Sequence, residues 1–318
     1  PDIRQSAMRA KELLEQPQQT QSPHQIEKPQ TNPTPTLQEP VQKMNSTPNT
    51  STNPFEELMK SAQSNLYTED IPLLSSPDRS VKLKTMSVEE YKFLAKQFEG
   101  FKESLRKEKD DSSMFLLQKE FDLTKALDVV LQRCIMNDIQ FSELSVYDWL
   151  YCLLYLRCIS RDDVCYIKPQ KDAEPIKISL EGILKSLDER KEEFLPNPWN
   201  TVQISEDKIL YVLAPSRLDQ CFSYQSAIQQ SDFTFYMLEM TSTLKAYNSN
   251  GEYYLMTPEQ RLQLFNVLDY KQMKKISDTY DKYDKAFYNV INETIREQTG
   301  KETKPVNFID FLIFFYGL

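Results

Sequence analysis

Side chains able to carry out catalysis are few in this sequence. It contains one histidine, His24, which lies in the segment QSPHQIEKPQ. The composition of that segment is typical of disordered chain, and a mobile histidine cannot be held against a substrate or a zinc ion. Nucleophilic chemistry that needs a histidine base, and histidine-based metal sites, are therefore not expected. The phosphate-cradling motifs GxGxxG and GxxxxGK[ST] do not occur.

The cysteines predict neither a disulfide nor a metal site. Their number is odd, no CxxC pair occurs, and no signal peptide is recognised ahead of them. Four of the five lie in apolar surroundings, where a thiol usually serves as a small buried hydrophobic group. The protein is expected to reside in a reducing cytoplasm. It is not expected to bind a cofactor or a metal ion. The five are Cys134, Cys152, Cys158, Cys165 and Cys221.

Adjacent carboxylates are the remaining candidates for acid–base chemistry. Asp162 with Asp163, and Glu192 with Glu193, could serve a hydrolase, but adjacent acids in a charged loop are usually a solvated face. We therefore expect no enzymatic activity, with a carboxylate hydrolase as an alternative. The net charge of −9 and the isoelectric point near 5.0 also disfavour nucleic-acid binding, which needs clustered positive charge.

Arg157 stands inside the most apolar helical stretch, SVYDWLYCLLYLRCIS, residues 145–160. The stretch is too short for a membrane span, which needs about 20 apolar residues, so it is expected to be the central helix of a core, with Ser145 as its N-cap. Arg157 would then be buried and must be paired. A structural ion pair is favoured over catalysis. The candidate partners are Asp148, Asp162 and Asp163.

The first 67 residues are predicted to form an extended or disordered arm. Residues 17–54 consist almost entirely of Gln, Pro, Thr, Ser and Asn, and such a segment cannot bury enough apolar surface to become ordered alone. Two short amphipathic helices flank it, at about residues 2–16 and 54–66. They either pack on the body of the chain or dock onto other chains. Their candidate partner-binding residues are Ile3 and Leu14 in the first, and Phe55, Leu58, Met59 and Leu66 in the second.

Residues 68–318 are predicted to be globular, with a potential division into lobes 68–160 and 161–318. The expected fold is mainly α with small β elements, an α+β class with a helical core and short hairpins. Helices are expected after the cap Ser87, over 121–136, after the cap Ser179, over 232–246 and after the cap Thr257. Strands are expected at 80–86 and within DVCYIKPQ, EPIKISL and TVQISEDKILYVLAPSRLDQ.

The chain ends in a short aromatic segment, PVNFIDFLIFFYGL. It is too short to span a membrane and too apolar to be left in water. It is expected either to close the core as a last strand or helix, or to bind a partner. The candidate contact residues are Phe311, Phe314 and Phe315.

Several segments, in this order, resemble the T4-type myovirus baseplate hub and hub-assembly family. The first two are IPLLSSPDRSVKLKTMSVEEYKFLAK and FDLTKALDVVLQRCIMNDIQFSELSVYDWLYCLLYLRCIS, in which Leu156, Arg157 and Ser160 match the Leu-Arg and Ser positions of the family. IKISLEGILKSL, ILYVLAPSRLD and FIDFLIFFYGL follow. The similarity covers roughly residues 68–318.

This resemblance implies a tail-baseplate protein. The expected role is a non-enzymatic structural component of the hub region, located in the virion after assembly in the host cytoplasm. It would join other baseplate and tail proteins in a hetero-oligomeric assembly through its arm and its apolar tail, without nucleic acid and without a membrane span. Two alternatives stay open: a non-virion assembly factor of the same family, and a cellular interaction adaptor.

Overall fold

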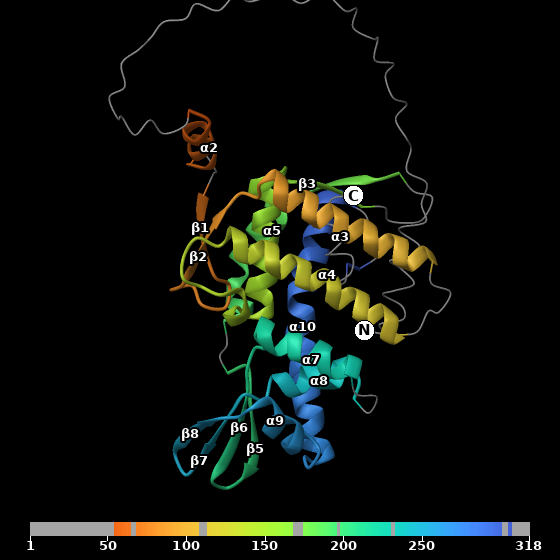
Figure 1. Cartoon of the computed structure of the whole chain (residues 1–318). Helices are drawn as coiled ribbons and strands as arrows, with labels where there is room; N and C mark the ends of the chain where they lie inside the picture. Colours follow the sequence, from red (N-terminus) through yellow and green to blue (C-terminus); the bar gives the residue numbers. More distant parts are fainter. Residues whose placement is uncertain are drawn as a thin grey trace, which may run out of the picture. The chain divides into compact units, whose positions relative to one another are not determined.

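The computed structural model describes residues 54–64, 68–107, 113–167, 174–195, 198–229, 233–300 and 305–306 (Figure 1). These residues form helices and small antiparallel sheets, which confirms the predicted α+β class. The first proposed docking helix lies outside the described residues, and so does the aromatic C-terminal segment apart from Pro305 and Val306. The roles predicted for Ile3, Leu14, Leu66, Phe311, Phe314 and Phe315 therefore stay predictions.

Helix α2, Pro54–Ser64, belongs to a different compact unit from the elements that follow it. Proline suits the first position of a helix because its missing N–H would have no partner there. Glu56 and Glu57 lie in the first turn, where negative charge is favoured by the helix dipole.

A hairpin and two long helices open the body. Strands β1, Thr68–Pro72, and β2, Ser80–Lys84, pair antiparallel. Helix α3, Val88–Lys107, starts as predicted after Ser87, whose backbone N–H donates to Glu90 at 2.8 Å. Helix α4, Ser113–Cys134, begins well before the predicted residue 121. The early start places Leu117 in a small buried cluster with Phe121 and Tyr224, and this tertiary contact is not visible in local periodicity.

The central helix is α5, Val146–Ser160, and most of its side chains are buried. Ser145 caps it as predicted, accepting from the Asp148 backbone N–H at 3.1 Å. The hairpin of β3, Val164–Ile167, and β4, Ile176–Ser179, follows, and Ser179 then caps α6, Leu180–Glu189. Short 3₁₀ turns occur at Phe141–Glu143 and Lys191–Glu193.

A four-stranded antiparallel sheet has the order β5-β6-β7-β8. The two predicted strands are β5, Asn200–Ser205, and β6, Lys208–Val212. Helices α7, Arg217–Gln229, and α8, Phe235–Ser242, are inserted before β7, Ala246–Ser249, and β8, Glu252–Leu255.

The expected helix over 232–246 is therefore wrong at its end, because β7 starts at Ala246. The side chains at the end of α8 bond back to its own carbonyls, and such bonds compete with helix continuation. They are those of Thr241, Ser242 and Thr243, whose hydroxyls donate to the carbonyls of Leu238, Glu239 and Met240 at 2.6–2.7 Å.

The last described helices are α9, Pro258–Phe265, and α10, Tyr270–Thr299. Both start with capping boxes, and Thr257 is the predicted cap of α9. Helix α10 contacts β5 of the four-stranded sheet, α8, β4 and α6 along its length. One large hydrophobic cluster includes residues from Ile71 to Val306 and so crosses the predicted lobe boundary at residue 160. The division into two lobes stays a prediction.

Candidate functional site: a partner-binding helix and its polar framework

Helix α2 carries three of the predicted partner-binding residues on one face. Phe55, Leu58 and Met59 recur at spacings of three and four, and their exposed fractions are 62%, 63% and 46%. Apolar side chains this exposed, gathered on one side of a helix, are typical of a surface that is covered by another protein.

The predicted ion pair of Arg157 is formed with Asp162. Arg157 is buried, and its Nη2 lies 2.8 Å from Asp162 Oδ1. Its Nη1 donates to the Asp162 carbonyl at 2.7 Å, and its Nη2 to the Val164 carbonyl at 3.3 Å. The guanidinium thus ties the last turn of α5 to the start of β3, which is a structural role.

The prediction that Asp148 could pair with Arg157 is wrong. The two residues are nine positions apart on α5, which separates them by about 13 Å along the axis. Asp148 instead accepts from the Ser75 backbone N–H at 3.0 Å and from the Ser145 hydroxyl at 2.7 Å. It joins the cap of α5 to the loop between β1 and β2.

A second buried arginine, Arg217, was not predicted. Its side chain is fully buried, and it binds Asp128 through two parallel bonds, Nε–Oδ1 at 2.9 Å and Nη2–Oδ2 at 3.0 Å. Its guanidinium carbon lies 4.4 Å from the centre of the Trp149 ring. One side chain of α7 therefore holds both α4 and α5, with the cation satisfied by a carboxylate and by the face of an aromatic ring.

Glu239 of α8 extends this framework to α10. Its carboxylate accepts from Gln220 Nε2 at 3.0 Å and from the Tyr280 hydroxyl, while Gln220 also accepts from Arg217. Burial, with the nearby negative charge of Asp284 adding to it, raises the pKa of Glu239 to about 7. The group is therefore held close to the point between its neutral and charged forms at neutral pH.

Glu120 of α4 has a similar environment. It accepts a hydrogen bond from the Tyr224 hydroxyl of α7, and both residues are buried. Burial raises the pKa of Glu120 to about 7, although Tyr224 and Arg217 act in the opposite direction. Burial likewise raises the pKa of Asp284, on α10, to about 6.

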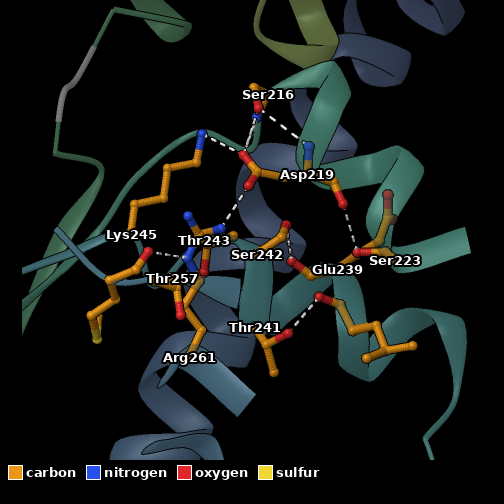
Figure 2. Close-up of polar contacts among 12 residues, drawn as sticks. Ser216, Asp219, Ser223, Glu239, Thr241, Ser242, Thr243, Lys245, Thr257 and Arg261 are labelled. Atoms are coloured by element: carbon orange, nitrogen blue, oxygen red, sulfur yellow. Dashed lines mark hydrogen bonds and ion pairs between the residues drawn. The ribbon is translucent and has the colours of Figure 1, made fainter. Parts of the chain in front are cut away.

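Asp219 has the opposite behaviour, because two cations surround it (Figure 2). Its Oδ2 lies 2.7 Å from Lys245 Nζ and its Oδ1 2.6 Å from Arg261 Nη1, and Ser216 donates to it from the backbone at 2.9 Å and from the hydroxyl at 2.6 Å. Burial would raise the pKa of Asp219, but Lys245, Ser216 and Arg261 outweigh it and lower the pKa to about 2. The carboxylate joins the start of α7 to α9 and to the segment that enters β7.

Together these contacts make a polar framework, defined as Arg217, Asp128, Gln220, Glu239, Tyr280, Glu120, Tyr224, Asp219, Lys245 and Arg261. Each buried carboxylate in it is hydrogen-bonded to a side chain from another element, so the framework fixes the helices of the body against one another. In the part of the chain that the structure describes, no three His, Cys, Asp or Glu side chains are arranged to hold a metal ion. None of the described helices combines the length and apolarity that crossing a membrane requires.

An open groove at the start of α10 gathers positive charge on this acidic chain. Lysines at 271, 274, 275 and 282 line it beside Trp199 and Tyr283, whose rings stack with centroids 4.6 Å apart. Lys274 is paired with Asp278 at 2.9 Å, and Lys275 donates to the Thr201 carbonyl at 2.6 Å. These bonds already engage part of the charge, and Lys275 also serves to hold α10 against β5.

Comparison of the chain with protein-family models, curated proteins and solved structures found no match.

Proposed function

We propose that this protein is a non-enzymatic structural component of a contractile phage tail baseplate, in the hub region, where it joins neighbouring subunits. The observation that carries the proposal is the exposed apolar face of α2, which belongs to a unit separate from the body. The sequence resemblance over residues 68–318 supplies the class of assembly, and other baseplate and tail proteins are the proposed partners.

The energetics of α2 suit a tethered joint. Burying a large apolar side chain contributes roughly 1.5–3 kcal/mol, so three such side chains contribute about 5–9 kcal/mol. Much of this is consumed by ordering the segment and by holding two molecules together. A single helix of this kind binds weakly alone, and it binds firmly where the assembly keeps its partner at a high local concentration.

The polar framework suits the other half of this role, a body that keeps its shape under load. Buried, hydrogen-bonded networks of this kind restrict the packing to one arrangement, because any shift leaves a buried charge without its partner. Its side chains bond α4, α7, α8, α9 and α10 to one another, and Arg217 also contacts Trp149 of α5.

The test is mass spectrometry of purified phage particles, with the wild-type chain and two variants. The double change Leu58→Ser and Met59→Ser removes two members of the exposed α2 face, and the matched double change Glu56→Gln and Lys60→Gln alters polar residues of the same helix. We expect the wild-type and the polar variant in the particle, and at least a tenfold loss of the Leu58/Met59 variant.

Three outcomes would contradict the proposal. A particle without the wild-type chain would rule out a structural component and favour the assembly factor of the same family. Equal incorporation of both variants would show that α2 is not the joint. Purification of the wild-type chain with a cellular protein, and with no viral one, would favour the interaction adaptor.

A further inference from the structure

The two edge strands of the four-stranded sheet differ in whether another element covers them. On the β5 edge, α10 covers the strand, and the Thr201 and Gln203 carbonyls accept from Lys275 Nζ at 2.6 Å and Gln272 Nε2 at 3.5 Å. The opposite edge is β8, which lies on the outer side of the sheet in Figure 1. All four of its residues are exposed, Tyr253 by 58% and Leu255 by 73%.

The pairing of β8 with β7 determines which of its backbone groups face outward. The Met256 N–H donates to the Lys245 carbonyl at 2.8 Å, so these two residues form a hydrogen-bonded pair of the ladder. Such pairs alternate along an antiparallel ladder, which makes Tyr247–Tyr254 and Ser249–Glu252 the next ones. The N–H and C=O groups of Tyr253 and Leu255 therefore point away from β7, and no backbone bond joins them to the other described residues.

A bare edge of this kind is a template for another strand. Natural sheets usually guard such edges with a lysine, a proline, a bulge or a covering element. The one charged side chain of β8 is that of Glu252, next to the turn; Tyr253, Tyr254 and Leu255 carry no charge, the strand contains no proline, and it pairs with β7 without a register shift. The contrast with the covered β5 edge indicates that β8 is kept open for a partner.

We propose that β8 pairs antiparallel with β8 of a second copy of this chain, across a two-fold axis that passes beside Tyr254. The two residues with outward backbone groups flank Tyr254 symmetrically. In the pair, the N–H and C=O of Tyr253 meet those of the partner's Leu255, and those of Leu255 meet the partner's Tyr253. The two four-stranded sheets then become one continuous eight-stranded sheet.

The side chains are compatible with this register. On one face of the sheet, Tyr253 packs against Tyr211, with ring centroids 5.7 Å apart, and would gain the partner's Leu255 as its neighbour. On the other face, Tyr254, stacked on Tyr247 at 5.1 Å, would lie beside the partner's Tyr254. Aromatic–aliphatic and aromatic–aromatic pairs are favourable across strands. Glu252 falls opposite the partner's Met256, so no like charges meet.

The side chains of this register are what favour a second copy over an unrelated segment, because the two Tyr254 rings meet each other, Tyr253 meets an apolar side chain, and no like charges are opposed. An isologous interface also requires each group to meet its counterpart across the axis, which this antiparallel register satisfies. The contact is short, so we infer a weak, concentration-dependent dimer. This inference is independent of the proposed baseplate role, because the test uses the purified chain alone.

The test is sedimentation velocity of the full chain over a range of concentrations, with three variants. Tyr253→Pro removes an outward N–H that makes no bond to β7, and Tyr253→Thr keeps the N–H but removes the ring. Tyr270→Thr removes a ring that is more exposed, 80% against 58%, but lies at the start of α10. We expect the wild-type and Tyr270→Thr to dimerise alike, and Tyr253→Pro to raise the dissociation constant at least tenfold. Tyr253→Thr should have an intermediate effect.

A covalent trap gives a second readout that does not depend on a proline folding well. In the proposed register Tyr254 opposes itself in a non-hydrogen-bonded pair, where the Cα atoms lie about 4.5 Å apart and a disulfide can form. Tyr254→Cys should therefore give a disulfide-linked dimer under mild oxidation, whereas Tyr270→Cys and the wild-type should not.

Two results would overturn the inference. One is a wild-type chain that stays monomeric at every concentration while Tyr254→Cys fails to crosslink, which would leave the edge for an extended segment of another protein. The other is a dimer that Tyr253→Pro leaves unchanged although circular dichroism shows it to be folded. If Tyr253→Pro does not fold, Leu255→Lys, which places a charge on the edge, takes its place with the same expectation.

Discussion

The two buried arginines show how differently a guanidinium can be held. Arg157 pairs with Asp162, whose side chain is 54% exposed, and two backbone carbonyls satisfy other N–H groups of Arg157. Arg217 depends on Asp128, which is itself buried, and on the ring of Trp149. Removing the carboxylate should lower the free energy of unfolding far more at Arg217 than at Arg157, because water cannot take the place of the buried Asp128 carboxylate.

We expect Asp128→Asn to lower the free energy of unfolding by about 3–5 kcal/mol, since it leaves Arg217 buried without a counter-charge. The matched change Asp162→Asn should cost less than about 1 kcal/mol, because that pair is partly screened by water and the carbonyl bonds of Arg157 persist. Urea unfolding of the two variants and the wild-type measures both values. Equal losses would contradict the difference in burial on which this prediction depends.

Sequence reasoning found Arg157 but not Arg217, for a physical reason. Arg157 interrupts an apolar run, so its burial and its need for a partner follow from the pattern. The buried side of α7 is itself polar and includes Arg217, Gln220, Ser223 and Tyr224. A search for helical periodicity of apolar residues cannot recognise such a face. The bonded partners are also distant in sequence: Asp128 lies 89 positions from Arg217, and Glu239 lies 19 positions from Gln220.

At the scale of elements, the turn between β7 and β8 is set by two residues. Asn250 has φ 54° and Gly251 φ 86°, which are the left-handed values of a two-residue type I′ hairpin. The pair Asn-Gly is a strong short-range sign of a hairpin, so the sequence held enough information to predict β7 and β8. The hairpin was not predicted, because the helix expected over 232–246 overlaps the start of β7 and leaves too few residues for a strand before the turn.

We expect Gly251→Ala to lower the free energy of unfolding by about 1 kcal/mol, because an L side chain is strained at this positive φ. An added Cβ meets nothing within 4 Å there, so the cost comes from the backbone alone. Gly100→Ala is the matched control. Gly100 lies inside α3, also with open space around it, and the change should stabilise the helix by about 0.5–1 kcal/mol. The same sign for both changes would contradict the assignment of the turn.

At the scale of the whole molecule, the local signals were more informative than the connections between elements. Caps at Ser87, Ser145, Ser179 and Thr257 were predicted from short motifs and are present. The polar framework was not, because it joins residues from α4, α7, α8, α9 and α10 that are far apart in sequence. Its charges nevertheless determine a property of the entire chain, the dependence of its stability on pH.

Carboxyl groups of the framework act in opposite directions on this dependence. A carboxyl whose folded pKa is raised binds its proton more tightly when folded, so stability falls as pH rises from the unfolded to the folded value. This applies to Glu120 and Glu239 of the framework, between about 4.5 and 7, and also to Asp284 of α10, which lies outside the framework, between about 3.8 and 6. For Asp219 the folded pKa is lowered to about 2, so its contribution is present above about 3.8 and is lost as the pH falls towards 2.

We therefore expect the free energy of unfolding to be greatest near pH 4–5 and to decline towards pH 7, measured by urea unfolding across this range. Repulsion within a chain of net charge −9 also lowers the free energy of unfolding as the pH rises, but salt screens this repulsion. Salt screens buried carboxyl groups much less, so most of the decline in the free energy of unfolding should persist in high salt. Glu120→Gln, which cannot ionise, should reduce the decline by up to about 3 kcal/mol while leaving stability at pH 4.5 little changed. Stability that rises steadily from pH 4 to pH 7, or a decline that Glu120→Gln does not alter, would show that burial does not raise the pKa of these carboxyl groups in the folded protein.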